Sequence, residues 1–310
     1  MSAPDWLPNV FILGVPKAGT TSLHNWIAAH PDALGARSKE ARFFVDPESH
    51  VFRPDFHIGQ GLARYREEFA HGAGRPARVV LDSTPAYLYQ RAAFDHVPAL
   101  PTAPRCLVIL REPADQIHSL YRYFRDNWGH VPADMSFAGF VAACRHGSHE
   151  FAGNELARHA LRNARYADIL RPWRARLGDE RLLVRSFDDL RADPRAFTVS
   201  VARWMGLDPA FYDDFDFPRE NLTLAPRIRW LQRANIALRA HLPKGAPYRL
   251  ARALYHRLNL RRQPVKTEEA EVMDRLRAEF AEANAALARE YGLDLSRWPM
   301  PRDQPVRTSS

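Results

Sequence analysis

The feature that most constrains the fold of this chain is a hydrophobic run that ends at a glycine and is followed by a helical pattern. Val10 to Leu13 are apolar, Gly14 follows them, and Gly19 comes five residues later. A buried strand that turns through glycines into a helix presents backbone N–H groups, and the positive end of the helix dipole, to an anion. The segment therefore predicts a strand and a helix joined by an anion-binding loop.

Similar apolar runs recur at residues 79–81, 106–110 and 182–187, with helical patterns between them. Short runs rich in branched apolar residues suit strands that are buried on both faces. Strands that alternate with helices form parallel sheets, whose ligands bind at the carboxyl ends of the strands. We therefore expect an α/β fold in which a P-loop-like parallel β-sheet is flanked by helices on both faces.

Three helices have clear signals at their ends. The first follows Gly19 and stops at His30-Pro31, because a residue before proline disfavours helical geometry. The second begins at Asp193-Pro194, a capping residue followed by a proline in the first turn, and Gly206 follows its end. The third runs from Thr267 to Tyr291 as a surface helix with an apolar stripe. The residues of the stripe are Val272, Leu276, Phe280 and Leu287.

The composition is that of a globular protein with a surplus of basic residues. The chain has 310 residues, 46% of them hydrophobic, and 44 Lys and Arg against 36 Asp and Glu give a formal charge of +8. This charge suggests an anionic ligand or surface without choosing among nucleotide, nucleic acid and lipid. We expect one domain over residues 1–298 and a disordered tail over residues 299–310.

Cysteine usage and the N-terminal residues predict a cytoplasmic protein. Two cysteines, Cys106 and Cys144, exclude a disulfide framework and favour a reducing compartment. The N-terminal sequence MSAPDWLPN has no basic segment leading into an apolar one. No uninterrupted apolar stretch approaches the ~20 residues that cross a bilayer.

Residues 221–262 depart in composition, with ten Arg or Lys and no Asp or Glu. Three interpretations stay open for this basic segment. It can be a solvated helical face, a lid or inserted wall that meets an anionic ligand, or a helix on a membrane surface. Leu250, Leu254 and Leu258 align beside arginines, which is the pattern of the last interpretation and would allow peripheral membrane contact.

The loop after the first strand resembles the phosphate-binding motif G-x-x-x-x-G-K-[ST] but moves its lysine. Lys17 lies inside the loop, and Thr20, Thr21 and Ser22 follow Gly19. In nucleoside triphosphatases the lysine after the second glycine reaches the terminal phosphates. That position holds Thr20 here, so the sequence weakens a triphosphatase interpretation. The loop still offers an anion the charge of Lys17 and three hydroxyl groups.

A second motif occupies residues 105–124, RCLVILREPADQIHSLYRYF. An apolar strand runs into Arg111, Pro113 suits the first turn of a helix, and Ser119 comes eight residues after Arg111. An arginine at the end of a strand and a serine on the next helix can both grasp one phosphate. Together with the first loop, this motif predicts a ligand with two anionic groups.

These segments resemble those of sulfotransferases that use 3′-phosphoadenosine 5′-phosphosulfate. GVPKAGTTSL is similar to their 5′-phosphosulfate loop, and LREPADQIHSLYRY is similar to their 3′-phosphate motif. Further similarities are SKEARFF, LDSTPAYLY, RYADILRPW, LLVRSFDDLRADP and YGLDLSRW, which together span most of the chain. The nearest likeness is to a bacterial branch related to heparan sulfate sulfotransferase domains.

The resemblance implies roles for individual residues. Lys17 would contact the sulfate and stabilise the leaving phosphate, Arg111 and Ser119 would hold the 3′-phosphate, and Glu40 would be the general base. The donor loop would be formed by Pro16, Lys17, Ala18, Gly19, Thr20, Thr21 and Ser22. The family needs no metal.

Two departures from the family pattern affect the site. Ser83 occupies the position of a lysine in the heparan-type enzymes, and no copy of their glycine-rich loop follows residue 220. Arg227 or Arg229 would then close over the 3′-phosphate and adenine. Three histidines, His24, His30 and His118, are alternative bases, because cytosolic relatives use histidine.

The resemblance therefore implies in-line transfer of a sulfuryl group to a hydroxyl or amine of a carbohydrate, glycolipid or small molecule. A P-loop kinase or nucleotide-binding protein is the alternative. A nucleic-acid binder, which would depend on the basic segment, is a third and disfavoured possibility. The sequence leaves the acceptor and the oligomeric state open. Candidate aromatic residues for an apolar pocket are Phe43, Phe44, Tyr87, Tyr89, Trp128 and Phe151.

Overall fold

The computed structural model describes residues 3–218, 225–226, 260–261 and 265–300. Its main sheet has five parallel strands in the order β2-β3-β1-β4-β5. The strands are β1 (Val10–Gly14), β2 (Ala33–Gly35), β3 (Val79–Asp82), β4 (Arg105–Leu110) and β5 (Leu182–Ser186). Val10 at the start of β1 pairs with Leu81 on one side and Arg105 on the other, so β1 lies at the centre of the sheet.

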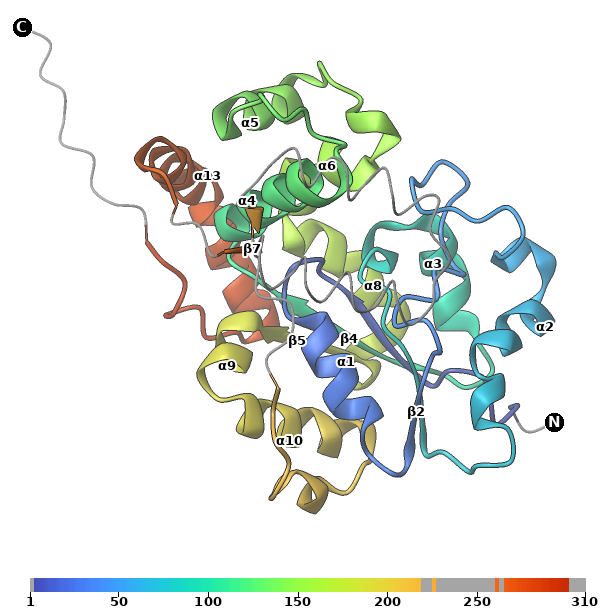
Figure 1. The fold of residues 1–310 in the computed structure, drawn as a ribbon. Helices are drawn as coiled ribbons and strands as arrows, with labels where there is room; N and C mark the ends of the chain where they lie inside the picture. The colour runs from blue at the N-terminus through green and yellow to red at the C-terminus, as the bar shows by residue number, and fades with distance from the viewer. Residues whose placement is uncertain (1–2, 219–224, 227–259, 262–264, 301–310) are drawn as a thin grey trace, which may run out of the picture.

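Helices surround this sheet (Figure 1). The α-helices are α1 (Thr20–Ala28), α2 (Leu62–Tyr65), α3 (Arg91–His96), α4 (Pro113–Tyr123), α5 (Phe137–His146), α6 (Glu155–Arg158), α7 (Ala160–Asn163), α8 (Tyr166–Arg181), α9 (Phe187–Ala192), α10 (Pro194–Met205) and α13 (Thr267–Tyr291). A π-helical turn, η6 (Phe124–Trp128), extends α4. Short 3₁₀ turns occur at 58–60, 66–68, 70–72, 87–89, 97–99, 151–153 and 209–212.

The connections of the sheet place helices on both faces and ligand loops at one edge. The chain leaves β1 through α1 toward β2 on one side, and leaves β4 through α4–α8 toward β5 on the other. Because such crossovers are right-handed, the two excursions cover opposite faces of the sheet. The carboxyl ends of β1 and β4 are neighbours, so the loops that follow them meet.

Two hydrophobic clusters support this arrangement. In the first, the fully buried residues of β1, β3 and β4 pack against Leu23 of α1, Trp173 of α8 and Val201 of α10. In the second, Ile117 of α4 and Phe280 of α13 pack with side chains of α5 and α7. Burial of each large apolar side chain contributes about 1.5–3 kcal/mol, so the first cluster stabilises the sheet with α1, α8 and α10, and the second holds α4 against α5, α7 and α13.

The strands and helices predicted from the sequence are confirmed, and other elements were not predicted. Four strands lie where the apolar runs predicted them, and α1, α10 and α13 keep their predicted ends. Asp193 caps α10, since its Oδ1 accepts from the N–H of Ala196 at 2.9 Å. Strand β2 was not predicted, because three residues directly after a helix are too few to show a period.

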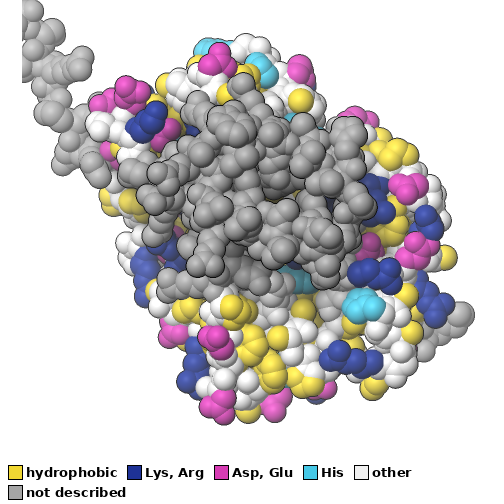
Figure 2. Space-filling view, viewed as in Figure 1, with side chains coloured by type: hydrophobic (Ala, Val, Ile, Leu, Met, Phe, Trp, Pro, Cys, Tyr) yellow, Lys and Arg dark blue, Asp and Glu magenta, His cyan; other side chains and the backbone are white. Residues whose placement is uncertain are grey.

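The surface seen in Figure 2 has basic and acidic side chains interspersed over its described part. Cys106 and Cys144 are both free. No helix in the described ranges is both long and apolar enough to span a membrane. Most of the basic segment, including Arg227 and Arg229, lies outside the described residues, as does the tail from residue 301. Within that segment, β6 (Ala225–Pro226) pairs antiparallel with β7 (Leu260–Arg261).

Candidate active site

A cavity of about 870 Å³ lies where the loops after β1 and β4 meet. Residues of both sequence motifs line it, together with the segment around Glu40. The predicted site residues that line it are Pro16, Lys17, Gly19, Thr20, Thr21, Ser22, Glu40, Arg111 and Ser119. Ala18 is not among its lining residues; it is fully buried, and its N–H donates to the carbonyl of Val15 at 3.3 Å.

The loop between β1 and α1 has the backbone geometry of an anion cradle. Lys17 and Gly19 both adopt left-handed conformations, with φ of 70° and 77°. A Cβ on Gly19 would lie 2.7 Å from the ring of Phe187, so this position requires glycine for space as well as for conformation. Gly19 precedes α1 without a side-chain cap, and the first N–H groups of a helix have no partner within it. They are therefore suited to bind a phosphate.

Lys17 joins the two motifs. Its backbone carbonyl accepts a hydrogen bond from Arg111 Nη1 at 3.0 Å, while its Nζ lies 4.2 Å from the centre of the Tyr123 ring. Burial, with the nearby charge of Arg111, lowers the pKa of Lys17 to about 8, although Glu40 opposes the shift. No carboxylate in the described part of the chain forms an ion pair with this ammonium group, so a bound anion would be its natural counter-charge.

Arg111 and Ser119 face the cavity from the end of β4 and from α4. The guanidinium carbon of Arg111 lies 5.5 Å from the Phe187 ring, and burial lowers the pKa of this arginine. Ser119 is buried, and its Oγ has no hydrogen-bond partner among the described residues. A buried hydroxyl without a partner costs about 1–3 kcal/mol, which a ligand oxygen would recover. The pair therefore suits a phosphate group.

Two neighbours that the sequence did not single out fix these motifs in place. Glu112 is buried and caps α4, because its carboxylate accepts from the N–H groups of Ala114 and Asp115 at 3.0 and 2.8 Å. Gln116 donates from Nε2 to the carbonyl of Pro16 at 3.3 Å. The acidic residue before Pro113 was a readable capping signal, whereas the Gln116 contact depends on the tertiary fold.

Glu40 lies in the cavity wall between two cations. Its Oε1 is 3.1 Å from Lys39 Nζ, and its Oε2 is 3.0 Å from Arg42 Nη2. Burial opposes ionisation, but the charges of Lys39 and Arg42 hold the pKa of Glu40 below its usual value. Arg42 has a φ of 58°, a costly backbone conformation for a residue other than glycine, and such strain often occurs at functional sites. Glu40 is thus an ionised carboxylate beside the donor loop.

Lys39 gives the cavity a cation, although Ser83 stands where the heparan-type enzymes have a lysine. Ser83 is fully buried, and its Oγ lies 2.8 Å from His24 Nδ1, so it does not line the cavity. Lys39 lines the cavity with its Nζ 3.3 Å from Thr20 Oγ1. Sequence reasoning missed Lys39, because a charged residue beside Glu40 looked like an ordinary surface neighbour.

The three histidine alternatives have different environments. Burial lowers the pKa of His24 to about 4, and this residue does not line the cavity. His30 contacts the carbonyl of Asp208 at 3.1 Å, also away from the cavity. His118 does line the cavity, with its Nε2 3.1 Å from Glu269 of α13. Of the three, His118 alone lines the cavity in the described structure.

Most of the aromatic residues expected in a pocket belong to the core instead. Trp128 does line the cavity, but the other five do not. Phe43, Phe44 and Tyr87 pack on one another in the first cluster, with ring centroids 5.1 Å apart for Phe43 and Phe44 and 5.7 Å apart for Phe44 and Tyr87. Phe151 is buried in the second cluster, and Tyr89 packs against both clusters. The residues for which the pocket expectation was wrong are Phe43, Phe44, Tyr87, Tyr89 and Phe151. The aromatic residues that line the cavity are Trp26, Tyr123, Phe124, Trp128 and Phe187.

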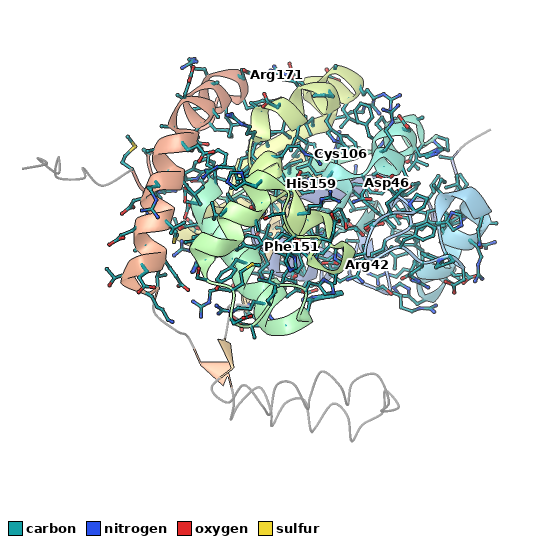
Figure 3. All side chains as sticks on the ribbon, turned by 90° about the horizontal axis from the view of Figure 1, so that it is seen from above. Arg42, Asp46, Cys106, Phe151, His159 and Arg171 are labelled. Atoms are coloured by element: carbon teal, nitrogen blue, oxygen red, sulfur yellow. The ribbon has the colours of Figure 1, made fainter. Side chains whose placement is uncertain are left out.

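A basic group outside the cavity is already neutralised by acidic partners. This group on α8, Arg171 and Arg174, is ion-paired with Glu290, Asp168 and Asp179. Arg171 lies at the edge of the molecule, well separated from Arg42 of the cavity (Figure 3). Within the same ranges, no three His, Cys, Asp or Glu side chains converge to hold a metal ion.

Comparisons with known proteins agree with this geometry. The family model described as "Sulfotransferase domain" matches residues 7–216. Human bifunctional heparan sulfate N-deacetylase/N-sulfotransferase 2 is 23% identical over 210 residues, which are 66% of this chain and 22% of that protein. Mouse heparan sulfate glucosamine 3-O-sulfotransferase 3B1 is 26% identical over 207 residues, which are 65% of this chain and 46% of that protein.

The chain thus spans between about a fifth and a half of the length of these relatives. Among solved structures, a sulfotransferase from Alicyclobacillus acidocaldarius superimposes with a TM-score of 0.62 at 21% identity, covering 94% of this chain and 98% of that one. This similarity shows a shared fold. Because the family model covers more than half of the chain, the protein belongs to the sulfotransferase family.

Proposed function

We propose that the protein transfers a sulfuryl group from 3′-phosphoadenosine 5′-phosphosulfate to a hydroxyl group, or to an amine, of a carbohydrate, glycolipid or small molecule. The observation that carries this proposal is the hydrogen bond between Arg111 and the carbonyl of Lys17. It holds two anion-binding motifs against one cavity, as a donor with a phosphosulfate and a separate 3′-phosphate requires.

The places of the predicted donor-binding residues in the cavity support the roles that we propose for them. N–H groups at the start of α1, with Thr20, Thr21 and Ser22, would hold the 5′-phosphate. Arg111 and the unpartnered Ser119 Oγ would hold the 3′-phosphate. Lys17 would stabilise the charge that gathers on the leaving phosphate oxygen, an interaction that strengthens in the transition state.

Glu40 would take the proton of the acceptor. An ionised carboxylate at the cavity wall is ready to accept a proton, and general-base help of this kind contributes ~10²–10⁴-fold. Lys39 lies between Glu40 and Thr20 of the donor loop, so it would hold the carboxylate beside the sulfuryl group. No step of this proposal needs a metal ion.

We also propose that residues 1–298 act as one sulfotransferase domain in the cytoplasm. Trp298 supports the first point, because its Nε1 donates to Ser186 Oγ of β5 at 3.2 Å and its side chain packs in the cluster around the sheet. The free thiols of Cys106 and Cys144 support a reducing compartment. The role of Arg227 and Arg229 as a cover for the adenine end of the site stays a prediction.

Calorimetry of the full chain tests the donor class. We expect adenosine 3′,5′-bisphosphate to bind tightly without magnesium and ATP to bind weakly with or without it. Arg111→Ala should abolish this preference, whereas Arg171→Ala, at an ion-paired arginine outside the cavity, should leave it intact. Magnesium-dependent binding of ATP in place of the bisphosphate would favour the kinase or nucleotide-binding alternative.

A further inference from the structure

The segment that carries Glu40 has no regular structure of its own to hold it. Residues 36–46 lie in neither a helix nor a strand. The N–H groups of Arg42, Phe43 and Phe44 therefore have no partners along a backbone ladder, although the two phenylalanines are fully buried. Buried N–H groups are almost always paired, so other parts of the protein must supply their acceptors. Whatever supplies them also fixes the position of Glu40.

Two hydroxyl groups from one short segment accept these three hydrogen bonds. The hydroxyl of Tyr87 accepts from the N–H groups of Phe43 and Phe44 at 2.8 and 3.3 Å. Thr84 Oγ1 accepts from the N–H of Arg42 at 3.2 Å. Arg42 has a φ of 58°, so this last bond holds a backbone conformation that residues other than glycine seldom adopt.

Both hydroxyl groups donate to one carboxylate, that of Asp82 at the end of β3. Thr84 Oγ1 donates to its Oδ1 at 2.8 Å, and the Tyr87 hydroxyl donates to its Oδ2 at 3.0 Å. The hydroxyl of Tyr65 also donates to Oδ2, at 2.6 Å. Burial raises the pKa of Asp82 to about 6, although hydrogen bonds from the three hydroxyls oppose the shift, so the carboxylate is ionised at neutral pH. It is fully buried and does not line the cavity.

The carboxylate of Asp82 sets the direction in which both hydroxyl groups point. A hydroxyl has one proton and two lone pairs, so a hydroxyl that donates to Asp82 keeps its lone pairs for backbone N–H groups. The same chain of contacts continues to the cavity, because Arg42 donates from Nη2 to Glu40 Oε2 at 3.0 Å. An unbroken series of hydrogen bonds and one short stretch of backbone therefore join Asp82 to Glu40.

We propose that Asp82 is a positioning residue for the general base, acting through the hydroxyl groups of Thr84 and Tyr87. This inference rests on the proposed function and deepens it, because it takes Glu40 as the group that receives the acceptor proton. Asp82 itself neither receives that proton nor contacts the donor. It fixes where the Glu40 carboxylate stands in the cavity wall.

Two tyrosines that donate to the same oxygen of Asp82 provide a matched pair of variants. Tyr87→Phe removes the acceptor of two N–H groups of the Glu40 segment. Tyr65→Phe removes an equally buried hydroxyl that also donates to Asp82 but holds no N–H group of residues 36–46. The two exchanges take the same bond from Asp82, so they differ in whether the segment loses its support.

Hydrogen exchange of the full chain, followed by NMR, measures that support without any ligand. In Tyr87→Phe the amides of Phe43 and Phe44 should exchange about 5-fold faster or more, because each loses a hydrogen bond. The rate is taken relative to the amide of Leu107 in β4, which reports unfolding of the sheet. In Tyr65→Phe the same ratio should match the wild type. Equal ratios in the two variants would overturn the inference.

Single-turnover transfer shows whether the support matters for the reaction. The donor is mixed with a pool of 2-naphthol, tyramine and glucosamine, and the bisphosphate formed is measured, which counts transfer to every acceptor including water. Tyr87→Phe should react about 10-fold more slowly or worse, because a displacement of 1 Å can cost ~10²-fold. Tyr65→Phe should react within about 2-fold of the wild type, and both variants should bind the bisphosphate normally. Equal rates in the two variants would overturn the inference.

Conservative exchanges keep the test open if a variant fails to fold. Asp82→Asn, whose amide nitrogen cannot accept from a hydroxyl, should behave like Tyr87→Phe. Thr84→Val should also slow transfer, whereas Thr84→Ser keeps the hydroxyl and should recover most of the rate. A serine variant as slow as the valine variant would show that the hydroxyl of Thr84 is not what positions the segment.

The Glu40→Gln background decides whether the effect passes through the base. In that background Tyr87→Phe should slow transfer by less than about 2-fold, because the base that it positions is already gone. A loss as large as in the wild-type background, or a wild-type rate in Glu40→Gln alone, would overturn the inference and leave donor binding standing. If the wild-type chain neither binds the bisphosphate nor forms it, the proposed function itself is wrong, and the inference falls with it.

Discussion

Arg111 donates a hydrogen bond from Nη1 to the backbone carbonyl of Lys17 at 3.0 Å, across 94 positions of sequence. The contact makes one arginine serve two purposes, since the same guanidinium faces the cavity and fixes the conformation of the donor loop. Because Lys17 has a positive φ, its peptide group needs such a constraint to stay in place. Substitutions at either residue should therefore affect the other motif.

Arg111→Ala should weaken the binding of adenosine 3′,5′-bisphosphate by about 10- to 100-fold, because a charge-assisted hydrogen bond contributes roughly 1.5–3 kcal/mol. Adenosine 5′-phosphate, which lacks the 3′-phosphate, should lose much less affinity. Calorimetry with both nucleotides measures the difference. Equal losses would mean that Arg111 acts only by shaping the loop.

Lys17→Ala should lower kcat by ~10²-fold or more while the dissociation constant of the bisphosphate changes by a few-fold at most. The physical reason is that the ammonium group faces charge that develops on the leaving phosphate during transfer, which the bisphosphate does not reproduce. Single-turnover transfer and calorimetry on the same variant separate the two quantities. A rate within a few-fold of the wild type would remove Lys17 from the proposed mechanism.

The rate should also depend on pH through Lys17. Its pKa of about 8 in the free protein means that the ammonium form is lost as pH rises through that value. The kcat/KM for the donor, which reports groups of the free enzyme, should therefore fall above about pH 8. Lys17→Arg keeps its charge at high pH, so its lower kcat/KM should stay constant beyond pH 9. The same fall in both proteins would assign the titration to another group.

The sequence predicted the strands and the loops that follow them better than it predicted the residues that line the cavity. Lys17, Arg111 and Ser119 were readable because each belongs to a local strand-to-helix pattern with its own spacing. The role of Glu40 as a base was predicted from the family resemblance, because no pattern in the neighbouring sequence distinguishes a basic carboxylate from any other. Val51, Trp128 and Leu156 meet in the lining of the cavity, and their meeting depends on long-range packing that periodicity does not encode.

Ser83 shows that the sequence could name a missing family residue but could not predict what its replacement contacts. From the sequence it was a missing lysine, whereas in the structure it is the partner of His24 in the interior. Both residues are buried, so the hydroxyl of Ser83 serves the core and not the cavity. The contact of Lys39 with Thr20 in the cavity could likewise be read only from the positions of the atoms.

The buried His24 should make stability depend on pH. Burial lowers its pKa from 6.5 to about 4, so between these values the unfolded chain binds more protons than the folded one. Stability should therefore be complete above about pH 6.5 and fall as the pH drops toward 4, by at most about 3 kcal/mol. Urea unfolding at pH 7 and pH 5 measures this. His24→Gln can still contact Ser83 but does not titrate, so its two unfolding free energies should differ less.

Glu40→Gln should lower single-turnover transfer by ~10²-fold or more, because the amide keeps the size of the side chain but cannot take the acceptor proton. Affinity for the bisphosphate should stay near the wild-type value, since the role proposed for Glu40 is in deprotonating the acceptor. The ion pairs with Lys39 and Arg42 allow a purely structural alternative. Partly exposed pairs of this kind contribute roughly 0–1 kcal/mol to stability and nothing to rate.

A charge-preserving exchange decides between these two roles of Glu40. Glu40→Asp retains a basic carboxylate but withdraws it from Lys39 and Arg42, so it should keep more transfer than Glu40→Gln even though it loses the ion pairs. If ion pairing were the whole role, both variants would lose a little stability and transfer at nearly the wild-type rate. A rate that survives in Glu40→Gln would leave His118, the histidine of the cavity lining, as the group to test next, because it alone among the three histidine alternatives could reach an acceptor there.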